Sequence, residues 1–178
     1  MIDLRDFVTA EQLKDGTAVT VRAVRPDDKG RIVTAFRELE PETIYTRYFQ
    51  HKVDLSDEEL RRATEVDFER EVALVVTIGQ GEGETIIGGA RYIVHEDANG
   101  EKGAEIAFTV EEDYQGQGIA SSLLRHLIQI ARAKGLARLD AEVLASNRSM
   151  LAVFSRSGLP MKTERLDDVV LVTLALGA

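Results

Sequence analysis

Apolar residues along this chain recur with two different periods. Residues 17–24 alternate between polar and apolar side chains, which is typical of a half-buried strand. Later apolar runs are separated by short turns rich in glycine and charged residues, which predicts an antiparallel meander. Its three strands are predicted at residues 70–78, 85–94 and 104–110.

Three helices are predicted between the first strand and the meander. The free N–H groups of a first helical turn need acceptors. Two of the predicted helix starts offer a side-chain acceptor, and the third has proline, which lacks an N–H. The predicted starts are Asp27 or Asp28 after Pro26, Pro41 for the helix 41–50, and the capping box of Ser56 with Glu59 for the helix 56–65.

The pattern changes after residue 104. The third strand of the meander leads into a glycine turn and then into an amphipathic helix from Gly118 to Lys134, which Gly135 ends. Residues 136–144 are predicted to form the next strand. A strand–helix–strand unit of this kind is expected to have parallel strands.

A short helix and a last strand complete the pattern. The helix at residues 146–158 has Asn147 or Ser146 as its cap and Gly158 as its end, and a strand at 167–176 closes the sheet. The predicted fold is of the mixed α/β class, with a mostly antiparallel sheet and helices on both of its faces.

The composition is that of an ordinary globular protein. Of the 178 residues, 44% are hydrophobic and 30% are charged, and this length suits a single domain over residues 1–178. The absence of cysteine excludes disulfides and a cysteine nucleophile. No apolar run approaches the roughly 20 residues of a membrane span, and residues 1–16 lack the apolar core of a signal peptide. We therefore expect a cytoplasmic protein without a membrane partner.

The formal net charge is -9 at pH 7. Binding to a nucleic-acid backbone needs a cationic face, so this charge argues against a nucleic-acid partner. An acidic protein suits a cationic substrate or a partner with a basic patch. The same charge is also common because it keeps proteins soluble.

The turn at residues 115–120, QGQGIA, places glycines between a strand and the start of a helix. Free N–H groups at such a start bind phosphate, and glycine lets the backbone approach it closely. A P-loop is excluded because Ile119 and Ala120 stand where that motif needs lysine and Ser/Thr. A dinucleotide-binding turn fits poorly because Ser121 occupies the position of its third glycine. A plain glycine corner without a ligand is the other alternative.

The same residues match the pattern Gln/Arg-x-x-Gly-x-Gly/Ala, and here the chain resembles the GNAT superfamily of N-acetyltransferases. The resemblance extends from about residue 15 to residue 176. Within it, five stretches are similar to the acetyltransferase domain of bacterial protein-lysine acetyltransferases. They are KDGTAVTVRAVRPDD, YTRYF, DFEREVALV, AEIAFTVEEDYQGQGIASSLL and EVLASNRSML.

The resemblance implies the GNAT fold, with acetyl-CoA as cosubstrate and no metal. In that superfamily the glycine loop holds the pyrophosphate of acetyl-CoA. A backbone N–H at the end of the preceding strand, where the sheet splays, stabilises the oxyanion. The cofactor-binding residues implied in this way are Phe108, Thr109, Val110, Gln115, Gly116, Gln117, Gly118, Ile119, Ala120, Asn147, Ser149 and Phe154.

Glu105 is the candidate general base. It interrupts an apolar strand, and alternation places it with Ala107 and Thr109 on one face, opposite Ile106 and Phe108. A lysine amine has an ordinary pKa of about 10.4 and must lose a proton before it attacks. We expect Glu105 to be half-buried, with its pKa raised by burial. The resemblance implies general-base work, since histone-type members have a glutamate in a similar AEI strand; a solvated edge glutamate or a structural ion pair is the alternative.

Phe154 departs from the superfamily pattern. Many members have a tyrosine at this place that protonates the departing thiolate, which phenylalanine cannot do. Tyr114, near the glycine loop, could substitute, although packing is the commoner role of such a tyrosine. Asn147 is matched to a cofactor-contacting asparagine and is equally suited to capping a helix.

The sequence argues against two other kinds of site, a zinc site and a hydrolase nucleophile. His51, His95 and His126 are dispersed along the chain, which argues against a zinc site. Ser121 and Ser122 lie in a helix start without a nucleophile elbow, which argues against a hydrolase.

The predicted function is direct transfer of an acetyl group from acetyl-CoA to an amine, with a protein lysine as the expected acceptor. A small amine or amino acid is an alternative acceptor, and a non-catalytic acyl-CoA-binding module is an alternative of another class. A monomer or a homodimer is expected. The aromatic residues of YTRYF, 45–49, are predicted to pack in the core on a helix that borders the acceptor cleft.

Overall fold

The structure is a computed structural model that describes residues 3–48 and 54–177, without the side chains of residues 45–48. The strands are β1 (Val8–Gln12), β2 (Ala18–Ala23), β3 (Glu71–Ile78), β4 (Thr85–Glu96), β5 (Lys102–Val110), β6 (Arg138–Leu144), β7 (Met161–Leu166) and β8 (Val169–Ala175). The α-helices are α1 (Lys29–Glu38), α2 (Pro41–Tyr48), α3 (Asp57–Thr64), α4 (Ile119–Ala133) and α5 (Arg148–Ser155).

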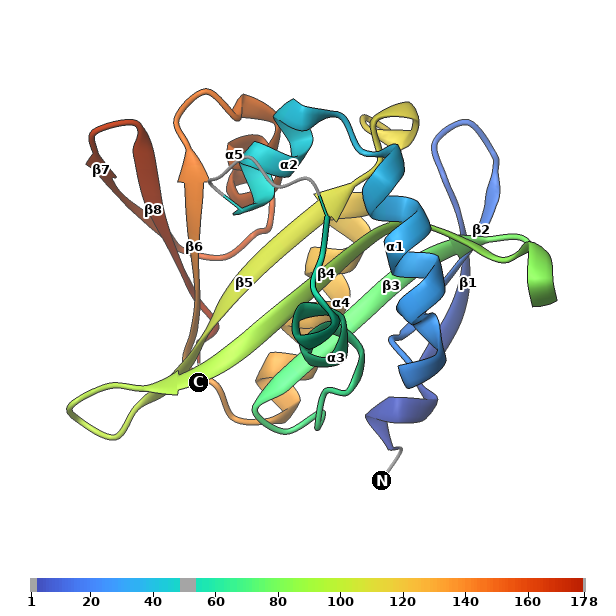
Figure 1. Cartoon of the computed structure of the whole chain (residues 1–178). Coiled ribbons are helices and arrows are strands. Elements are labelled where there is room, and N and C mark those ends of the chain that lie inside the picture. The colour runs from blue at the N-terminus through green and yellow to red at the C-terminus, as the bar shows by residue number, and fades with distance from the viewer. Residues whose placement is uncertain (1–2, 49–53, 178) are drawn as a thin grey trace.

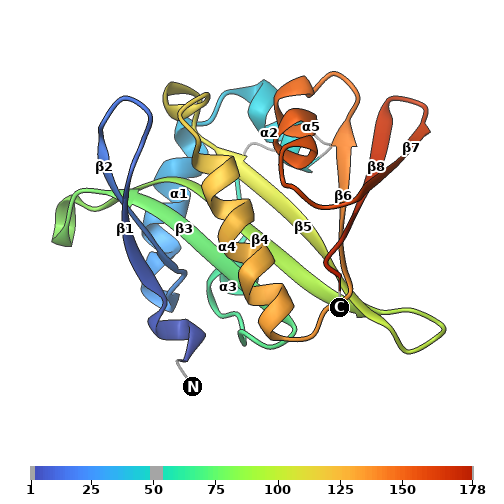
Figure 2. The ribbon, with the colours of Figure 1, turned by 180° about the vertical axis from the view of Figure 1, so that it is seen from behind.

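Within the described residues, eight strands form one sheet in the order β1-β2-β3-β4-β5-β6-β8-β7. Neighbouring strands are antiparallel except β5 and β6, which are parallel and joined through α4. Helices α1, α2 and α3 lie on one face of the sheet, and α4 and α5 lie on the other (Figures 1 and 2). The mixed fold with helices on both faces is therefore confirmed.

The helices on both faces explain why the central strands are apolar throughout. Residues 72–77 of β3 are all buried, so this strand shows a continuous apolar run instead of an alternation. Helix α4 buries one stripe of side chains at the helical period against the sheet. That stripe consists of Ile119, Leu123, Leu124, Leu127, Ile128, Ile130 and Ala131.

Two strands were not predicted, and both are at the edges of the sheet. Strand β7 has the sequence MKTERL, and every residue after Met161 is exposed, so it has no apolar period. It turns back into β8 through Asp167, whose φ is 55°. Strand β1 alternates only between exposed and half-buried positions. Because an edge strand needs only one neighbour, its hydrophobic pattern is weak.

The helix starts agree with the sequence in two of three cases where a side-chain cap was predicted. Ser56 accepts a hydrogen bond from the N–H of Glu59, and Glu59 accepts one from the N–H of Ser56, each at 3.1 Å. Asn147, rather than Ser146, caps α5 by accepting from the N–H of Met150. Asp28 occupies the N-cap position of α1, as predicted, but its side chain makes no capping hydrogen bond there, because the carboxylate contacts arginines instead.

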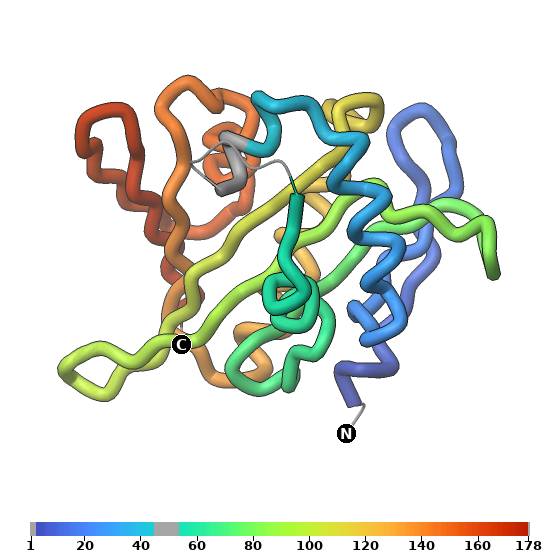
Figure 3. The backbone as a smooth tube through the Cα atoms, viewed as in Figure 1, coloured from blue at the N-terminus to red at the C-terminus, as the bar shows by residue number. Residues whose placement is uncertain are grey.

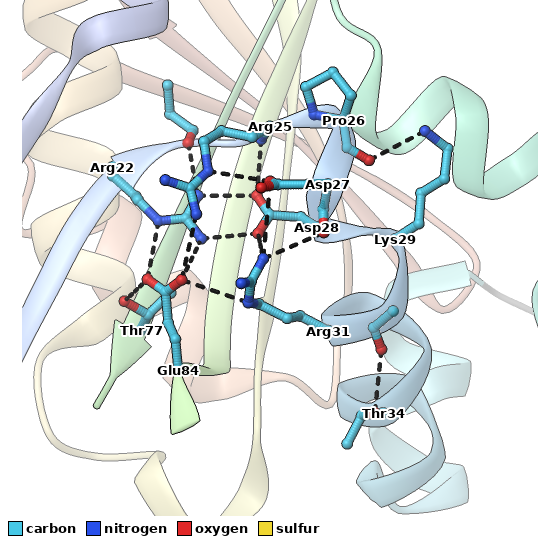
Figure 4. A network of polar contacts seen from close by, with 12 residues as sticks. Arg22, Arg25, Pro26, Asp27, Asp28, Lys29, Arg31, Thr34, Thr77 and Glu84 are labelled. Atoms are coloured by element: carbon cyan, nitrogen blue, oxygen red, sulfur yellow. Dashed lines mark hydrogen bonds and ion pairs between the residues drawn. The ribbon is translucent and has the colours of Figure 1, made fainter. Parts of the chain in front are cut away.

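Asp28 is part of a polar network in the interior, between β2, β3, the start of α1 and the start of β4 (Figure 4). Arg22 donates to both oxygens of Asp28 and also to both oxygens of Glu84. Thr77 donates to Glu84 at 3.0 Å, and Arg31 donates to Asp28 at 3.0 Å. These contacts join β2, β3, the residue before β4 and the start of α1 through polar side chains.

Candidate active site

Strands β5 and β6 separate from each other like the arms of a fork. They pair only over residues 103–105 and 138–140, whereas β5 stays paired with β4 as far as Val110. The diverging arms are seen in the backbone trace (Figure 3). Side chains of β5, β6 and α5 line a cavity between the arms, which we call the fork cavity. Its lining is Ile106, Ala107, Phe108, Ala141, Glu142, Val143, Leu144, Asn147, Met150 and Phe154.

The backbone of β5 directs hydrogen-bonding groups into the fork. The carbonyl of Lys102 accepts from β6-side Ala137, and the carbonyl of Val110 accepts from the side chain of Gln115, while the N–H of Glu111 donates to Ile87 on the β4 side. Backbone groups alternate in direction along a strand. The N–H groups of even-numbered residues, including Phe108 and Val110, therefore face the fork.

The glycine loop follows a turn of 3-10 helix, Glu112–Tyr114, at the open end of the fork. Gly116 and Gly118 have φ of 79° and 93°, a left-handed conformation that strains any residue with a Cβ. Ser122 donates to the carbonyl of Gly118, but within the described residues no acceptor is found for the N–H groups of residues 116–121. These free donors at the positive end of α4 suit an anion.

Helix α5 closes the far side of the fork cavity. Phe154 is 1% exposed and packs edge-to-face on Phe108, with ring centroids 5.9 Å apart. Asn147 and Phe154 both line the cavity, while Ser149 is exposed and Thr109 lies toward the other face of the sheet. The structure thus brings together Phe108, Asn147 and Phe154, but not Ser149 or the side chain of Thr109.

Glu105 lies where the fork begins, as the last residue of β5 that pairs with β6. Its side chain is exposed, so the prediction that it is half-buried is wrong. Across the β4–β5 pair, Ile93 is 45% exposed, which shows that the helices leave this part of the face uncovered. Alternation predicted the correct face but not how far the helices extend over it.

A second cavity, of about 140 Å³, lies on the face that carries α1 and α3. Ala107, Thr109 and Glu111 form its wall on the β5 side, and the rest of its lining is mostly apolar. Glu111 is half-buried, and burial, together with the nearby carboxylates of Asp113, Glu112 and Glu38, raises its pKa. Sequence reasoning did not consider Glu111; its place directly after the strand and before the loop was the available signal.

The remaining candidates have structural partners. His95 lies 2.9 Å from Asp140, and His126 and Ser122 both contact Glu11 of β1. Tyr114 is half-buried against the core. Within residues 3–48 and 54–177, no three acidic or histidine side chains are grouped as metal ligands.

Two predictions fall outside the described part of the chain. His51 and Phe49 are not among the residues that the structure describes, and neither are the side chains of Tyr45 and Tyr48. Among the helices that the structure describes, none is long and apolar enough to cross a membrane.

The site combines three features. They are a splayed pair of parallel strands, a loop of free N–H groups at the open end of that pair, and a second cavity on the other face of the sheet. This arrangement suits an acyltransferase that holds an extended, phosphate-bearing acyl carrier between the strands. Residues 34–159 match the Acetyltransferase (GNAT) family, and the chain belongs to this family. It is an N-acetyltransferase by family, with acetyl-CoA as its cosubstrate.

Individual known proteins that match most of this chain support its assignment to the family. The chain is 31% identical to Acetyltransferase PA5475 of Pseudomonas aeruginosa over 141 residues, which cover 79% of this chain and 74% of that protein. It is 33% identical to Acetyltransferase Pat of Mycolicibacterium smegmatis over 159 residues, or 89% of this chain, and spans only 46% of Pat. The crystal structure of the GNAT domain of S. lividans PAT superposes with a TM-score of 0.83 at 34% identity, covering 94% of this chain and 96% of that domain.

Proposed function

We propose that this chain transfers the acetyl group of acetyl-CoA directly to the side-chain amine of a protein lysine, with Glu105 as general base. The observation that carries the proposal is the position of Glu105, exposed at the base of the fork. The β5 arm beyond it offers backbone donors to a thioester, and the open face beside it admits an amine from solvent.

The free backbone N–H groups of the fork and of the glycine loop suit the polar groups of acetyl-CoA. The N–H groups of residues 116–121 would hold its pyrophosphate, and its pantetheine arm would lie along the side of β5 that β6 leaves unpaired. Phe154 and Phe108 would form an apolar wall beside that arm. A thioester held in this way would have its carbonyl near the N–H of Val110 or Phe108, either of which would donate to the oxyanion.

The chemistry balances with few groups. The ammonium of a lysine gives a proton to Glu105, and the neutral nitrogen attacks the thioester carbon. A C–N bond forms, the C–S bond breaks, and CoA leaves as a thiolate, while the nitrogen, positively charged after its attack, gives its second proton to solvent. Because Phe154 cannot donate a proton, the thiolate takes its proton from solvent.

The exposure of Glu105 favours a protein as acceptor over a small amine. A site built for a small amine would enclose it and present several polar groups. Here the base lies on an open surface, and the second cavity, on the same face of the sheet, is mostly apolar. A lysine on a folded protein can reach an open surface, and the five sequence stretches similar to protein-lysine acetyltransferases support the same acceptor.

The test is to incubate the protein with heavy-labelled acetyl-CoA and a cell lysate and to identify labelled products by mass spectrometry. We expect labelled lysines in proteins. Label only in small amines would support the small-amine alternative. Binding of acetyl-CoA without release of CoA for any acceptor would support the non-catalytic module.

The role of Glu105 is tested with a matched pair of variants. Glu105→Gln should lower turnover at least about tenfold near neutral pH while the affinity for acetyl-CoA is kept. Glu164→Gln, an exposed glutamate on β7, is the control and should leave both unchanged. Unchanged turnover in Glu105→Gln would remove this residue from the role.

A further inference from the structure

The tip of the β1–β2 hairpin lies against the glycine loop, although the two are 102 residues apart in the sequence. The N–H of Lys14 donates to the carbonyl of Gln117 at 3.2 Å, and the N–H of Asp15 donates to the Gln117 side chain at 3.1 Å. The hairpin and the loop lie next to each other in both views of the ribbon (Figures 1 and 2). The hairpin is therefore a second wall of the loop.

The side chain of Lys14 extends over Gly118. A Cβ at Gly118 would lie 3.7 Å from Cε and 3.9 Å from Cγ of Lys14, and no other atom would come within 4 Å of it. The Lys14 side chain is exposed, and within the described residues it has no hydrogen bond or ion pair. A cation at the end of a long, exposed side chain thus stands beside the free donors of the loop.

The hairpin is fixed in this place by a contact further along β1. Glu11 accepts hydrogen bonds from Ser122 and His126, and Arg125 lies 3.3 Å from it. These partners belong to the first turns of α4. Because the hairpin contacts both α4 and the loop, the backbone of Lys14 is held before any ligand binds.

The loop itself has an unfavourable charge for an anion. Residues 111–118 include Glu111, Glu112 and Asp113, and they include no lysine or arginine. The end of α4 contributes only about half a positive charge. A pyrophosphate here would face acidic neighbours, so a nearby cation would lower the free energy of the complex.

We propose that Lys14 is a further cosubstrate-binding residue, which contacts the pyrophosphate of acetyl-CoA from the β1–β2 hairpin and supplies the positive charge that the loop lacks. The inference rests on the proposed acetyl-CoA site. It makes the N-terminal hairpin part of that site.

The experiment compares three acetyl donors with the full chain. Acetyl-CoA and acetyl-dephospho-CoA both carry the pyrophosphate, and acetyl-pantetheine carries none. Lys14→Ala should lower kcat/KM for the first two by about tenfold and leave acetyl-pantetheine unchanged. Lys14→Arg should restore most of the loss, and Lys162→Ala on β7 is the control for removing an exposed lysine elsewhere. Higher ionic strength should reduce the difference between wild type and Lys14→Ala.

The outcomes separate this inference from the proposed function. If the wild type transfers no acetyl group from acetyl-CoA, the proposed function fails. If the wild type is active and Lys14→Ala is equally active with all donors, the inference fails. A loss with acetyl-CoA alone would move the contact to the 3′-phosphate and overturn the assignment to the pyrophosphate. A loss that includes acetyl-pantetheine would indicate a structural role and overturn it too.

Discussion

Arg22 and Asp28 form a two-point ion pair in the interior of the protein. Nη1 of Arg22 lies 2.9 Å from Oδ2 of Asp28, and Nη2 lies 2.8 Å from Oδ1. The side chains are 7% and 0% exposed. Since two charges are removed from water together, neither can lose its partner without a large cost.

The first prediction follows from this pairing. Asp28→Asn keeps the shape of the side chain but removes its charge, which leaves Arg22 buried with Glu84 as its remaining carboxylate. We expect the free energy of unfolding to fall by about 3 kcal/mol, as measured in urea. Glu58→Gln, which breaks an exposed pair with Arg61 on α3, is the control and should cause no measurable change. An equal effect of both variants would contradict the argument.

The second prediction concerns pH. Burial by itself would raise the pKa of Asp28, but hydrogen bonds from Arg22 and from the N–H of Arg25 outweigh it and hold the pKa below its usual value. A carboxyl group with a lowered folded pKa stabilises the fold above its unfolded pKa of about 3.9, and this contribution is lost as pH falls through the folded pKa. The stability difference between wild type and Asp28→Asn should therefore be constant near neutral pH and shrink below about pH 4. A difference that persists undiminished in strong acid would show that shape, not charge, causes it.

The third prediction uses two glycines with the same backbone strain. Gly116 and Gly135 have φ of 79° and 78°, and a Cβ at either would meet no atom within 4 Å. Alanine at either position should lower the free energy of unfolding by about 1 kcal/mol, because only the left-handed conformation is penalised. Only Gly116→Ala should also weaken acetyl-CoA binding, by about tenfold in calorimetry. Equal affinities in the two variants would argue against the loop as the phosphate site.

Helices and strands with a local hydrophobic period could be predicted from the sequence. Features that depend on contacts between residues far apart in the chain could not. The apolar stripe of α4 and the continuous run of β3 identify buried elements without any knowledge of their neighbours. Strand β7 has no such pattern, because its side chains are exposed. The polar network of Arg22 with Glu84 joins residues 62 positions apart, which no window of sequence can reveal.

The candidate site shows the same limit. The glycine loop and Phe154 were recognised from short motifs, and the structure places both beside the fork. The burial of Glu105 was predicted wrongly, since alternation gives the face of a strand but not the reach of the covering helices. Lys14 and Glu111 lie in stretches that resemble known acetyltransferases, but no pattern in those stretches distinguished them from their neighbours; their positions beside the loop and the second cavity become visible only in three dimensions.

The fourth prediction concerns the wall of the fork cavity. Phe154 is 1% exposed and packs against Phe108, so Phe154→Ala leaves a void among the core side chains. We expect the free energy of unfolding to fall by about 3–5 kcal/mol and the melting temperature by roughly 10 °C. The KM for acetyl-CoA should rise as well, because the apolar wall beside the pantetheine arm is lost. A loss below about 1 kcal/mol would mean that the surrounding side chains collapse into the space.

The last prediction concerns Glu111, whose pKa is raised by burial and by neighbouring carboxylates. A carboxyl group with a raised folded pKa holds its proton more tightly in the folded state, so its ionisation opposes folding as pH rises through the unfolded and then the folded pKa. Glu111→Gln removes that ionisation. Its melting temperature should exceed that of the wild type near neutral pH, and the gain should vanish below about pH 4, where both states of the wild type are protonated.

Glu164→Gln provides the control for this pH dependence, because Glu164 is exposed on β7 and far along the chain from the acidic cluster. Thermal melts of the three proteins across the acid and neutral range would show a pH-dependent gain for Glu111→Gln alone. If Glu111→Gln were instead less stable than the wild type at neutral pH, the carboxylate would have to make a favourable contact that outweighs its burial. The repulsion from Glu38, Glu112 and Asp113 argues for the opposite sign, and the same repulsion is what a cation at the loop would relieve.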